Sequence, residues 1–214
     1  MPPTLTAFER SPDRGRGLAR DFRLRWALEE VGQPYDLRLL SFDALKQPAH
    51  RALNPFGQIP TYEDGTVTLF ESGAILLHLA DLHPGLLPAD PTARARAVSW
   101  IFAALTTVEP PIIDLSMATM FEADKPWAAD RRPLLVSRVH SRLAELAQAL
   151  GPADWLGEDF CVADLLMVTV LRRLQSSPLL NDHPSLLAYI ARAEARPAFQ
   201  RACASQQTAA APPA

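Results

Sequence analysis

A proline at the entrance of a predicted strand is the feature that most restricts how this chain can fold. Pro60 follows Ile59 directly before the short apolar stretch that contains Thr61-Tyr62. Because proline has no backbone N–H, the strand begins without a sheet donor, and the backbone of the preceding residue can pair outside the sheet. Bonds before proline also tolerate the cis form far better than other peptide bonds, and a cis bond here would point the Ile59 backbone outward.

A helix that opens on a carboxylate and a hydroxyl follows this strand. Asp64-Gly65 predicts a turn, a second strand reaches Leu69-Phe70, and Glu71-Ser72 then begins a helix. The unsatisfied N–H groups and the dipole at a helix N-terminus both favour anions. Together, the strand entrance and the helix start predict a small pocket suited to a peptide-like, zwitterionic ligand.

The composition excludes several classes of protein. A chain of 214 residues, 48% hydrophobic and 21% charged, is ordinary for a soluble globular protein of one or two domains. A net charge of -3 gives no reason to expect nucleic acid or an anionic membrane as partner. We expect Arg, Asp or Glu to interrupt every apolar run before the roughly 20 residues of a membrane span. The N-terminus also lacks the pattern of a signal peptide, so a cytoplasmic protein is expected.

Cysteine and histidine provide no evidence for a metal site. Cys161 and Cys203 are too few for a disulfide framework or a zinc site, and both lie in the second half of the chain. Neither can serve as an enzyme thiol in the predicted pocket. The histidines have no metal-like spacing, so we predict that no metal is bound.

The hydrophobic pattern divides the chain into two parts. Residues 1–83 alternate strands and helices in the order β-α-β, α, β-β-α, which fits a small sheet with one parallel crossover and one antiparallel hairpin. The proline-rich segment 84–91 predicts a linker. Residues 92–207 show helical patterns without a strand signal and predict an all-helical bundle, and 208–214 predicts a flexible tail. In the second part we expect a helix over 92–120, bent near Pro110-Pro111, and helices over 134–150, 162–174 and 184–194.

Motifs along nearly the whole chain resemble those of the cytosolic glutathione transferase family. They are Arg23–Glu30 in the first helix, Asn54–Pro60, Glu71–Ile75 and Val162–Asp164. This resemblance implies a thioredoxin-like N-terminal domain, a helical-bundle C-terminal domain and a homodimer. It does not single out one class within the family.

The resemblance also assigns a glutathione site residue by residue. The cis-proline of the family falls on Pro60, and the Ile59 backbone would pair with the cysteinyl part of glutathione. Glu71 would bind the γ-glutamyl ammonium group, and Ser72 with the helix N–H groups would bind its α-carboxylate. An ordinary helix start, with serine as the N-cap, is the alternative for Ser72.

Two further residues are candidates for the glycyl carboxylate of glutathione. They are Gln58, beside the strand entrance, and Lys46 in the preceding weak helix. A solvated surface lysine is the alternative at position 46.

The group that activates the glutathione thiol is expected between the first strand and the first helix, because the thiolate is the attacking species. Without a Tyr or Cys in that region, Ser11 is the only hydroxyl in the loop. Ser11-Pro12 fits an N-cap followed by proline at the first helical position. A loop guanidinium that stabilises the thiolate by charge is the alternative, with Arg16 and Arg20 in reserve.

The second domain departs from the family pattern at its central helix. Cys161 stands where the family usually has Ser or Thr, three residues before Asp164, which predicts a weakened capping box and a buried, unreactive thiol. The electrophile pocket is expected along the first long helix of this domain. The candidates are Phe102, Leu105, Thr106, Met117 and Met120.

The sequence therefore predicts an enzyme with glutathione as its co-substrate. It would add the thiolate to a small hydrophobic electrophile, or use it to reduce one, as in detoxification. A glutathione-dependent peroxidase side activity, or an isomerase activity, would use the same site. The alternative is a non-catalytic glutathione-binding or protein-interaction member of the same fold, which the absence of a Tyr or Cys in the loop leaves open.

Overall fold

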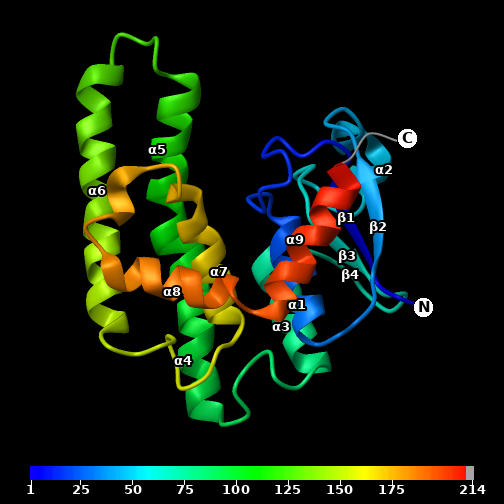
Figure 1. Ribbon diagram of the computed structural model, residues 1–214. Helices are drawn as coiled ribbons and strands as arrows, with labels where there is room; N and C mark the ends of the chain where they lie inside the picture. The colour runs from blue at the N-terminus through cyan, green and yellow to red at the C-terminus, as the bar shows by residue number, and fades with distance from the viewer. Residues whose placement is uncertain (211–214) are drawn as a thin grey trace. The chain divides into compact units, whose positions relative to one another are not determined.

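The structure, a computed structural model, describes residues 1–210, and their side chains up to Gln206. The chain forms two compact units (Figure 1). The first holds Met1–Ala89 together with Glu194 and the helix that follows it, and the second holds Asp90–Ala193. The first unit contains a sheet with helices and the second is helical, as the predicted fold class requires.

The first unit is built on a four-stranded sheet in the order β2-β1-β3-β4. β1 pairs in parallel with β2 and antiparallel with β3, and β3 and β4 form an antiparallel hairpin. The predicted combination of one parallel crossover and one hairpin is therefore confirmed. Its elements are β1 (Thr4–Phe8), α1 (Asp21–Glu30), β2 (Asp36–Leu40), the 3₁₀ turn η1 (Ala44–Lys46), α2 (Pro48–Arg51), β3 (Thr61–Glu63), β4 (Thr68–Phe70) and α3 (Ser72–Leu82).

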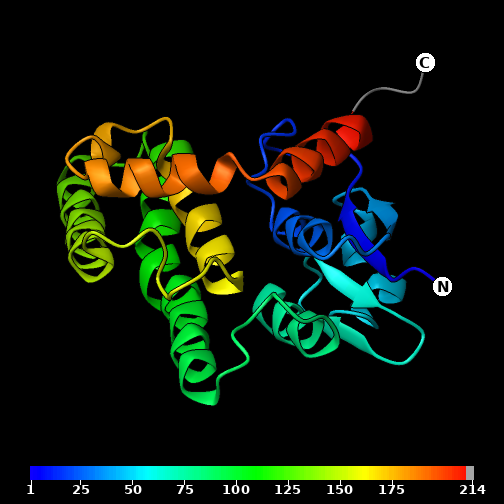
Figure 2. The same cartoon turned by 60° about the horizontal axis from the view of Figure 1, so that its bottom comes forward.

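The last helix, α9 (Pro197–Ala210), packs along α1 in the first unit (Figure 2). The ring of Phe199 stands edge-on to Phe22 and to Trp26, with ring centroids 5.4 and 4.9 Å apart. Arg196 adds a two-pronged ion pair with Glu30, at 2.7 and 2.8 Å. Aromatic packing and a fork-shaped charge contact thus hold α9 on the sheet-bearing unit.

The position of α9 differs from the predicted division of the chain. The sequence assigned 92–207 to the helical domain and ended the last helix before Pro197. Pro197 is instead the first residue of α9, a position where its missing N–H costs nothing. Of the predicted flexible tail, 208–210 continue α9, and 211–214 lie outside the described residues.

The second unit is a bundle around α7, every residue of which is buried. α4, η2 and α5 form one nearly continuous helical path, and α6 packs beside α5 (Figure 1). The elements are α4 (Pro91–Phe102), the π-helical turn η2 (Ala103–Val108), α5 (Glu109–Phe121), α6 (Ala128–Leu150), α7 (Val162–Leu171), the 3₁₀ turns η3 (Arg172–Leu174) and η4 (Pro178–Leu180), and α8 (Pro184–Glu194).

The irregularity predicted near Pro110-Pro111 is a π-helical turn directly before the two prolines. Their rings would clash with the carbonyl groups four residues earlier in a regular α-helix, and neither can donate to them. The wider π-turn moves those carbonyl groups away from the rings. The helix therefore continues into α5 without a break in the chain path.

The start of α7 has both arms of a capping box, with Cys161 in the place of the usual hydroxyl residue. Asp164 accepts hydrogen bonds from Cys161 N (3.0 Å), Leu156 N (2.9 Å) and the Tyr189 hydroxyl (2.9 Å). Burial, with the nearby charge of Asp164, raises the pKa of Cys161 to about 11. The thiol is therefore protonated at neutral pH, and its predicted burial is confirmed.

By length and composition alone, the helical stretch Pro91–Phe121 could cross a membrane. It holds an 18-residue window with a mean hydropathy of 1.3 and at most 2 charged residues. Glu109 and Asp114 interrupt its apolar run, as the sequence analysis expects. Core helices of soluble bundles meet the same criterion. In this chain the stretch packs against α6 and α7.

Replacing Phe199 with alanine tests how strongly α9 contributes to the first unit. Because the ring is buried between two aromatic side chains, Phe199→Ala should lower the free energy of unfolding by roughly 3–5 kcal/mol. Urea unfolding of the two proteins measures this difference. Phe42→Ala, which removes a mostly exposed ring, is the matched control. An equal decrease in the free energy of unfolding in both variants would show that α9 packing is not a main source of stability.

Candidate functional site

The strand entrance at Pro60 has the geometry that the sequence predicted. The Ile59–Pro60 bond is cis, and both residues are buried. The next backbone donor, Thr61 N, bonds the side-chain oxygen of Thr6 at 2.7 Å. The first donor of β3 is thus used inside the unit, directly after the proline.

The loop before Pro60 is fixed by buried partners. The carbonyl oxygen of Gln58 accepts a hydrogen bond from Asn54 Nδ2 (2.9 Å) and lies 3.0 Å from His50 Nε2. Gly57 has a φ of +64°, and a Cβ there would lie 2.9 Å from the carbonyl oxygen of Leu45, so only glycine fits. The Gln58 side chain is exposed. The backbone that leads to Ile59 is therefore held while the glutamine side chain can reach outward.

The start of α3 combines an unusual backbone with a buried hydroxyl. Glu71 is exposed and has φ 71° and ψ 114°, a conformation that a residue other than glycine adopts only when its surroundings require it. Ser72 is 4% exposed, and its Oγ accepts a hydrogen bond from Arg23 Nη1 at 3.1 Å. Glu71, not Ser72, is the N-cap residue, and no side chain caps this helix. The alternative of an ordinary serine cap is therefore wrong.

Lys46 lies at the end of η1 with its side chain 68% exposed. Its ammonium group pairs with the Asp43 carboxylate at 3.1 Å, and both groups are solvated, so this pair contributes little. The geometry fits a surface lysine as well as a ligand for the glycyl carboxylate. The role of Lys46 stays a prediction.

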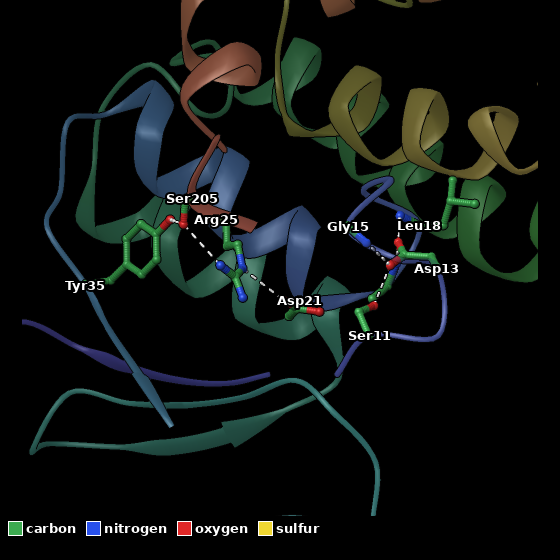
Figure 3. A network of polar contacts seen from close by, with 9 residues as sticks. Ser11, Asp13, Gly15, Leu18, Asp21, Arg25, Tyr35 and Ser205 are labelled. Carbon is green, nitrogen blue, oxygen red and sulfur yellow. Dashed lines mark hydrogen bonds and ion pairs between the residues drawn. The ribbon is translucent and has the colours of Figure 1, made fainter. Parts of the chain in front are cut away.

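The loop after β1 is organised by Asp13, a residue that the sequence analysis did not single out (Figure 3). Its carboxylate accepts from the Ser11 hydroxyl (2.5 Å) and from the backbone N–H groups of Gly15, Leu18 and Ala19 (3.1, 2.5 and 3.1 Å). Ser11 is half-buried. One carboxylate thus fixes the loop that carries the candidate catalytic serine.

Ser11 is not a helix cap, contrary to the sequence interpretation. α1 begins at Asp21, and its N-cap residue is Arg20. The residues after Pro12 form turns closed by the Asp13 carboxylate. The dipole of α1 therefore does not act on the Ser11 hydroxyl through a capping arrangement.

The charge of Asp13 limits the ability of Ser11 to donate a hydrogen bond to the glutathione sulfur. Burial would raise the pKa of Asp13, but the hydrogen bonds from Ser11 and from the backbone of Leu18, Ala19 and Gly15 outweigh it and lower the pKa below its ordinary value. Asp13 is therefore an anion at neutral pH, and a nearby anion disfavours a thiolate. The single Ser11 proton is already donated to it, so Ser11 must break this bond before it can donate to sulfur.

The reserve arginines lie in or beside the same loop. Arg16 Nε donates to the backbone carbonyl of Asp13 at 3.0 Å, and Arg20 stands at the start of α1. Arg16 thus supports the Asp13 loop in addition to any role at sulfur. Its contribution to a thiolate stays a prediction.

Arg25, which pairs with the buried carboxylate of Asp21, ties α1 to α9 (Figure 3). Arg25 Nε pairs with Asp21 at 2.8 Å, and Arg25 Nη1 donates to Ser205, which also bonds the Tyr35 hydroxyl at 2.9 Å. Burial raises the pKa of Asp21 despite the opposing charge of Arg25. No pattern in the sequence marks Asp21, Arg23 or Arg25 as buried, because charged residues on a helix are usually solvated.

The histidine nearest the hairpin has a structural contact. His78 Nε2 lies 3.3 Å from Asp64 in the β3–β4 turn. The backbone hydrogen bond from Val67, with a further one from Thr66, lowers the pKa of Asp64 to about 2. Within the part of the chain that the structure describes, no three His, Cys, Asp or Glu side chains are grouped to hold a metal ion.

The residues expected along the electrophile pocket lie on α4, η2 and α5 of the second unit. Leu105 is half-buried, and the other four are exposed: Phe102, Thr106, Met117 and Met120. Exposed apolar side chains of this kind suit a hydrophobic ligand or a protein contact. Their role stays a prediction.

Asp13→Ala tests whether this carboxylate holds the loop. Removing an acceptor that bonds several donors should open the segment locally and speed tryptic cleavage after Arg14 and Arg16 by about tenfold or more, since each bond to a charged group is worth at least that factor. Mass spectrometry of timed digests measures the cleavage rates. Asp36→Ala, which removes an exposed carboxylate, is the control. Unchanged cleavage at both arginines would contradict this role.

Comparisons with known proteins agree on one family. Residues 14–81 match the family model described as glutathione S-transferase, N-terminal domain. The chain is 30% identical over 188 residues to glutathione S-transferase 4 of Zea mays, covering 82% of this chain and 83% of that one. It is 31% identical over 129 residues to glutathione S-transferase F9 of Arabidopsis thaliana, covering 56% of this chain and only 59% of that one.

A solved structure extends the similarity to the whole fold. The crystal structure of a glutathione transferase from Burkholderia graminis superimposes with a TM-score of 0.84 at 26% identity. The match covers 95% of this chain and 88% of that one. That protein was crystallised with two glutathione molecules bound per subunit.

Proposed function

Because this chain belongs to the cytosolic glutathione S-transferase family, we propose that it binds glutathione in its first unit and transfers the thiolate to a small hydrophobic electrophile. Reduction of an electrophile such as an organic peroxide would use the same site. Glutathione is the co-substrate, and no metal takes part. Detoxification in the cytoplasm is the role that this chemistry fits.

The observation that carries the proposal is the arrangement of two backbone segments in the first unit. A cis Ile59–Pro60 bond opens β3, and a buried Ser72 opens α3, which the β3–β4 hairpin precedes. Residues with free backbone groups at a strand entrance suit the cysteinyl part of a peptide. A helix N-terminus suits a carboxylate. The family relationship supports glutathione as the peptide that uses both.

The charges at the start of α3 match the γ-glutamyl end of glutathione. The Glu71 carboxylate is exposed and suits the ammonium group, while Ser72 and the first N–H groups of α3 suit the α-carboxylate. Gln58 and Lys46 would bind the glycyl carboxylate at the opposite end. The similar protein from Burkholderia graminis was crystallised with glutathione, which supports glutathione as the ligand.

Activation of the glutathione thiol depends on the loop after β1. Ser11 is the proposed hydroxyl at sulfur, but its proton is donated to the Asp13 anion. This observation favours a second function, a glutathione-binding protein without transferase activity. A loop arginine that stabilises the thiolate by charge is the intermediate possibility.

Electrophile binding and dimer formation complete the proposal. The exposed apolar residues of α4 and α5, Phe102 and Met120 among them, would line the electrophile pocket. Phe56 is 67% exposed on the loop before β3, and its ring lies edge-on to Phe70, at 6.1 Å between ring centroids. The homodimer is proposed from the family relationship.

Retention on glutathione resin, with release by free glutathione, tests the binding step. We expect retention of the folded protein and saturable binding in isothermal titration calorimetry. Turnover of a chlorinated aromatic and of an organic peroxide then separates the transferase from the non-catalytic alternative. A folded protein that fails to bind would overturn both functions, whereas binding without turnover would favour the second.

Ser72→Ala should weaken binding without slowing chemistry. Loss of one hydrogen bond to a carboxylate should raise the Kd for glutathione by about tenfold or more, and kcat at saturating glutathione should stay within about twofold. Calorimetry and steady-state kinetics measure the two effects. Ser137→Ala, on an exposed position of α6, is the matched control. A large loss of kcat at saturation would contradict a role confined to binding.

Ser11→Ala should slow the chemistry and leave glutathione binding nearly unchanged, because Ser11 is the residue proposed to activate the thiol. Because the hydroxyl would bond the thiolate, kcat should fall by about tenfold or more, with the Kd for glutathione nearly unchanged. Steady-state kinetics measures kcat, and calorimetry measures the Kd for glutathione. Unchanged turnover would remove Ser11 from the mechanism, and Arg16→Gln would then test the charged alternative.

A further inference from the structure

Arg23 is a buried cation in contact with the proposed anion-binding hydroxyl. It lies in the middle of α1, only 2% exposed, and its Nη1 is 3.1 Å from Ser72 Oγ. Arginine is rarely buried this completely, because its charge is costly to remove from water. Its guanidinium group places a positive charge beside the start of α3.

The contact with Arg23 decides whether the Ser72 hydroxyl donates or accepts each hydrogen bond. A guanidinium group has donors and no acceptor, so Ser72 Oγ is the acceptor in this hydrogen bond. The hydroxyl has one proton, and among the described residues that proton is donated to no other group. A donated bond from a cation also polarises the hydroxyl and makes it a stronger donor. Ser72 is thus prepared to donate to an acceptor outside the protein.

The charge of Arg23 adds to the field at the helix start. The first N–H groups of α3 carry a partial positive charge, and a guanidinium in a buried setting is weakly screened. On the adjoining position the Glu71 carboxylate is exposed. The start of α3 therefore offers a positive environment at Ser72 and a negative group at Glu71, the reverse of the charges on an α-amino acid.

We propose that Arg23 is a positioning residue for the γ-glutamyl end of glutathione, an inference that rests on the proposed function. Arg23 holds Ser72 so that the hydroxyl donates to the γ-glutamyl α-carboxylate, and its buried charge stabilises that carboxylate. It touches neither sulfur nor the electrophile. Its effect is therefore specific to one group of the ligand.

An analogue of glutathione separates this role from a purely structural one. In the analogue, the γ-glutamyl α-carboxylate is replaced by a neutral carboxamide of nearly the same shape. Calorimetry then measures the affinity of wild type, Arg23→Gln and Arg23→Lys for both ligands. Arg201→Gln is the matched control, because Arg201 also contacts α1, through Glu29 at 2.8 Å, but not Ser72.

Arg23→Gln should weaken glutathione binding by about tenfold or more, the factor expected for one interaction with a charged group, and carboxamide binding by less than about twofold. Arg23→Lys, which keeps the charge, should bind glutathione more tightly than Arg23→Gln does, but more weakly than wild type. The Arg201→Gln control should change neither affinity. In the Ser72→Ala background, Arg23→Gln should cost less than in wild type, because the two residues act on the same carboxylate.

The outcomes distinguish this inference from the proposed function. Wild-type protein that binds no glutathione would overturn both. If wild type binds but Arg23→Gln loses affinity equally for glutathione and the carboxamide, or loses none, only the inference is overturned. Circular dichroism checks the fold of each variant. Failure of both Arg23→Gln and Arg23→Lys to fold would assign Arg23 a structural role and overturn the inference as well.

Discussion

The burial of two arginines in α1 is the constraint on which the first unit depends. Arg23 and Arg25 are 2% and 1% exposed, so each must find hydrogen-bond partners inside the protein. Arg25 finds them in Asp21 and in Ser205 of α9. Arg23 bonds Ser72 at the start of α3. One helix therefore joins the C-terminal helix to the residues proposed to bind glutathione.

The same constraint separates binding from chemistry within the proposed site. Around Ser72 a cation and a helix N-terminus both favour an anion, so the γ-glutamyl carboxylate has a prepared place. Around Ser11 the nearest charged group is the Asp13 anion, which holds the serine proton and opposes a thiolate. The electrostatics of the unit thus favour glutathione binding more clearly than thiol activation. Activation of the thiol therefore depends on a change in the charges around sulfur, which bound glutathione or a loop arginine would provide.

Local patterns predicted much of the fold and part of the site. The turn at Asp64-Gly65 and the helix from Ser72 to Leu82 were predicted from a few neighbouring residues. The cis bond before Pro60 was implied by the resemblance to the glutathione transferase family. The N-cap assigned to Ser11 was wrong, because Asp13 closes the loop into turns and delays the helix to Asp21. The sequence pattern does not predict α9, because a proline at position 197 fits the end of one helix as well as the start of the next.

By itself, the sequence determined the order of strands and helices, the strand entrance at Pro60 and the family to which the chain belongs. The elements and the strand entrance depend on short motifs whose backbone preferences act within a few residues. The family was indicated by the resemblance of motifs along nearly the whole chain. Only the tertiary structure decided that Arg23 donates a hydrogen bond to Ser72 and that α9 belongs to the first unit. Such contacts join residues far apart in the chain, and a helical arginine has the same sequence pattern whether it faces water or a buried hydroxyl.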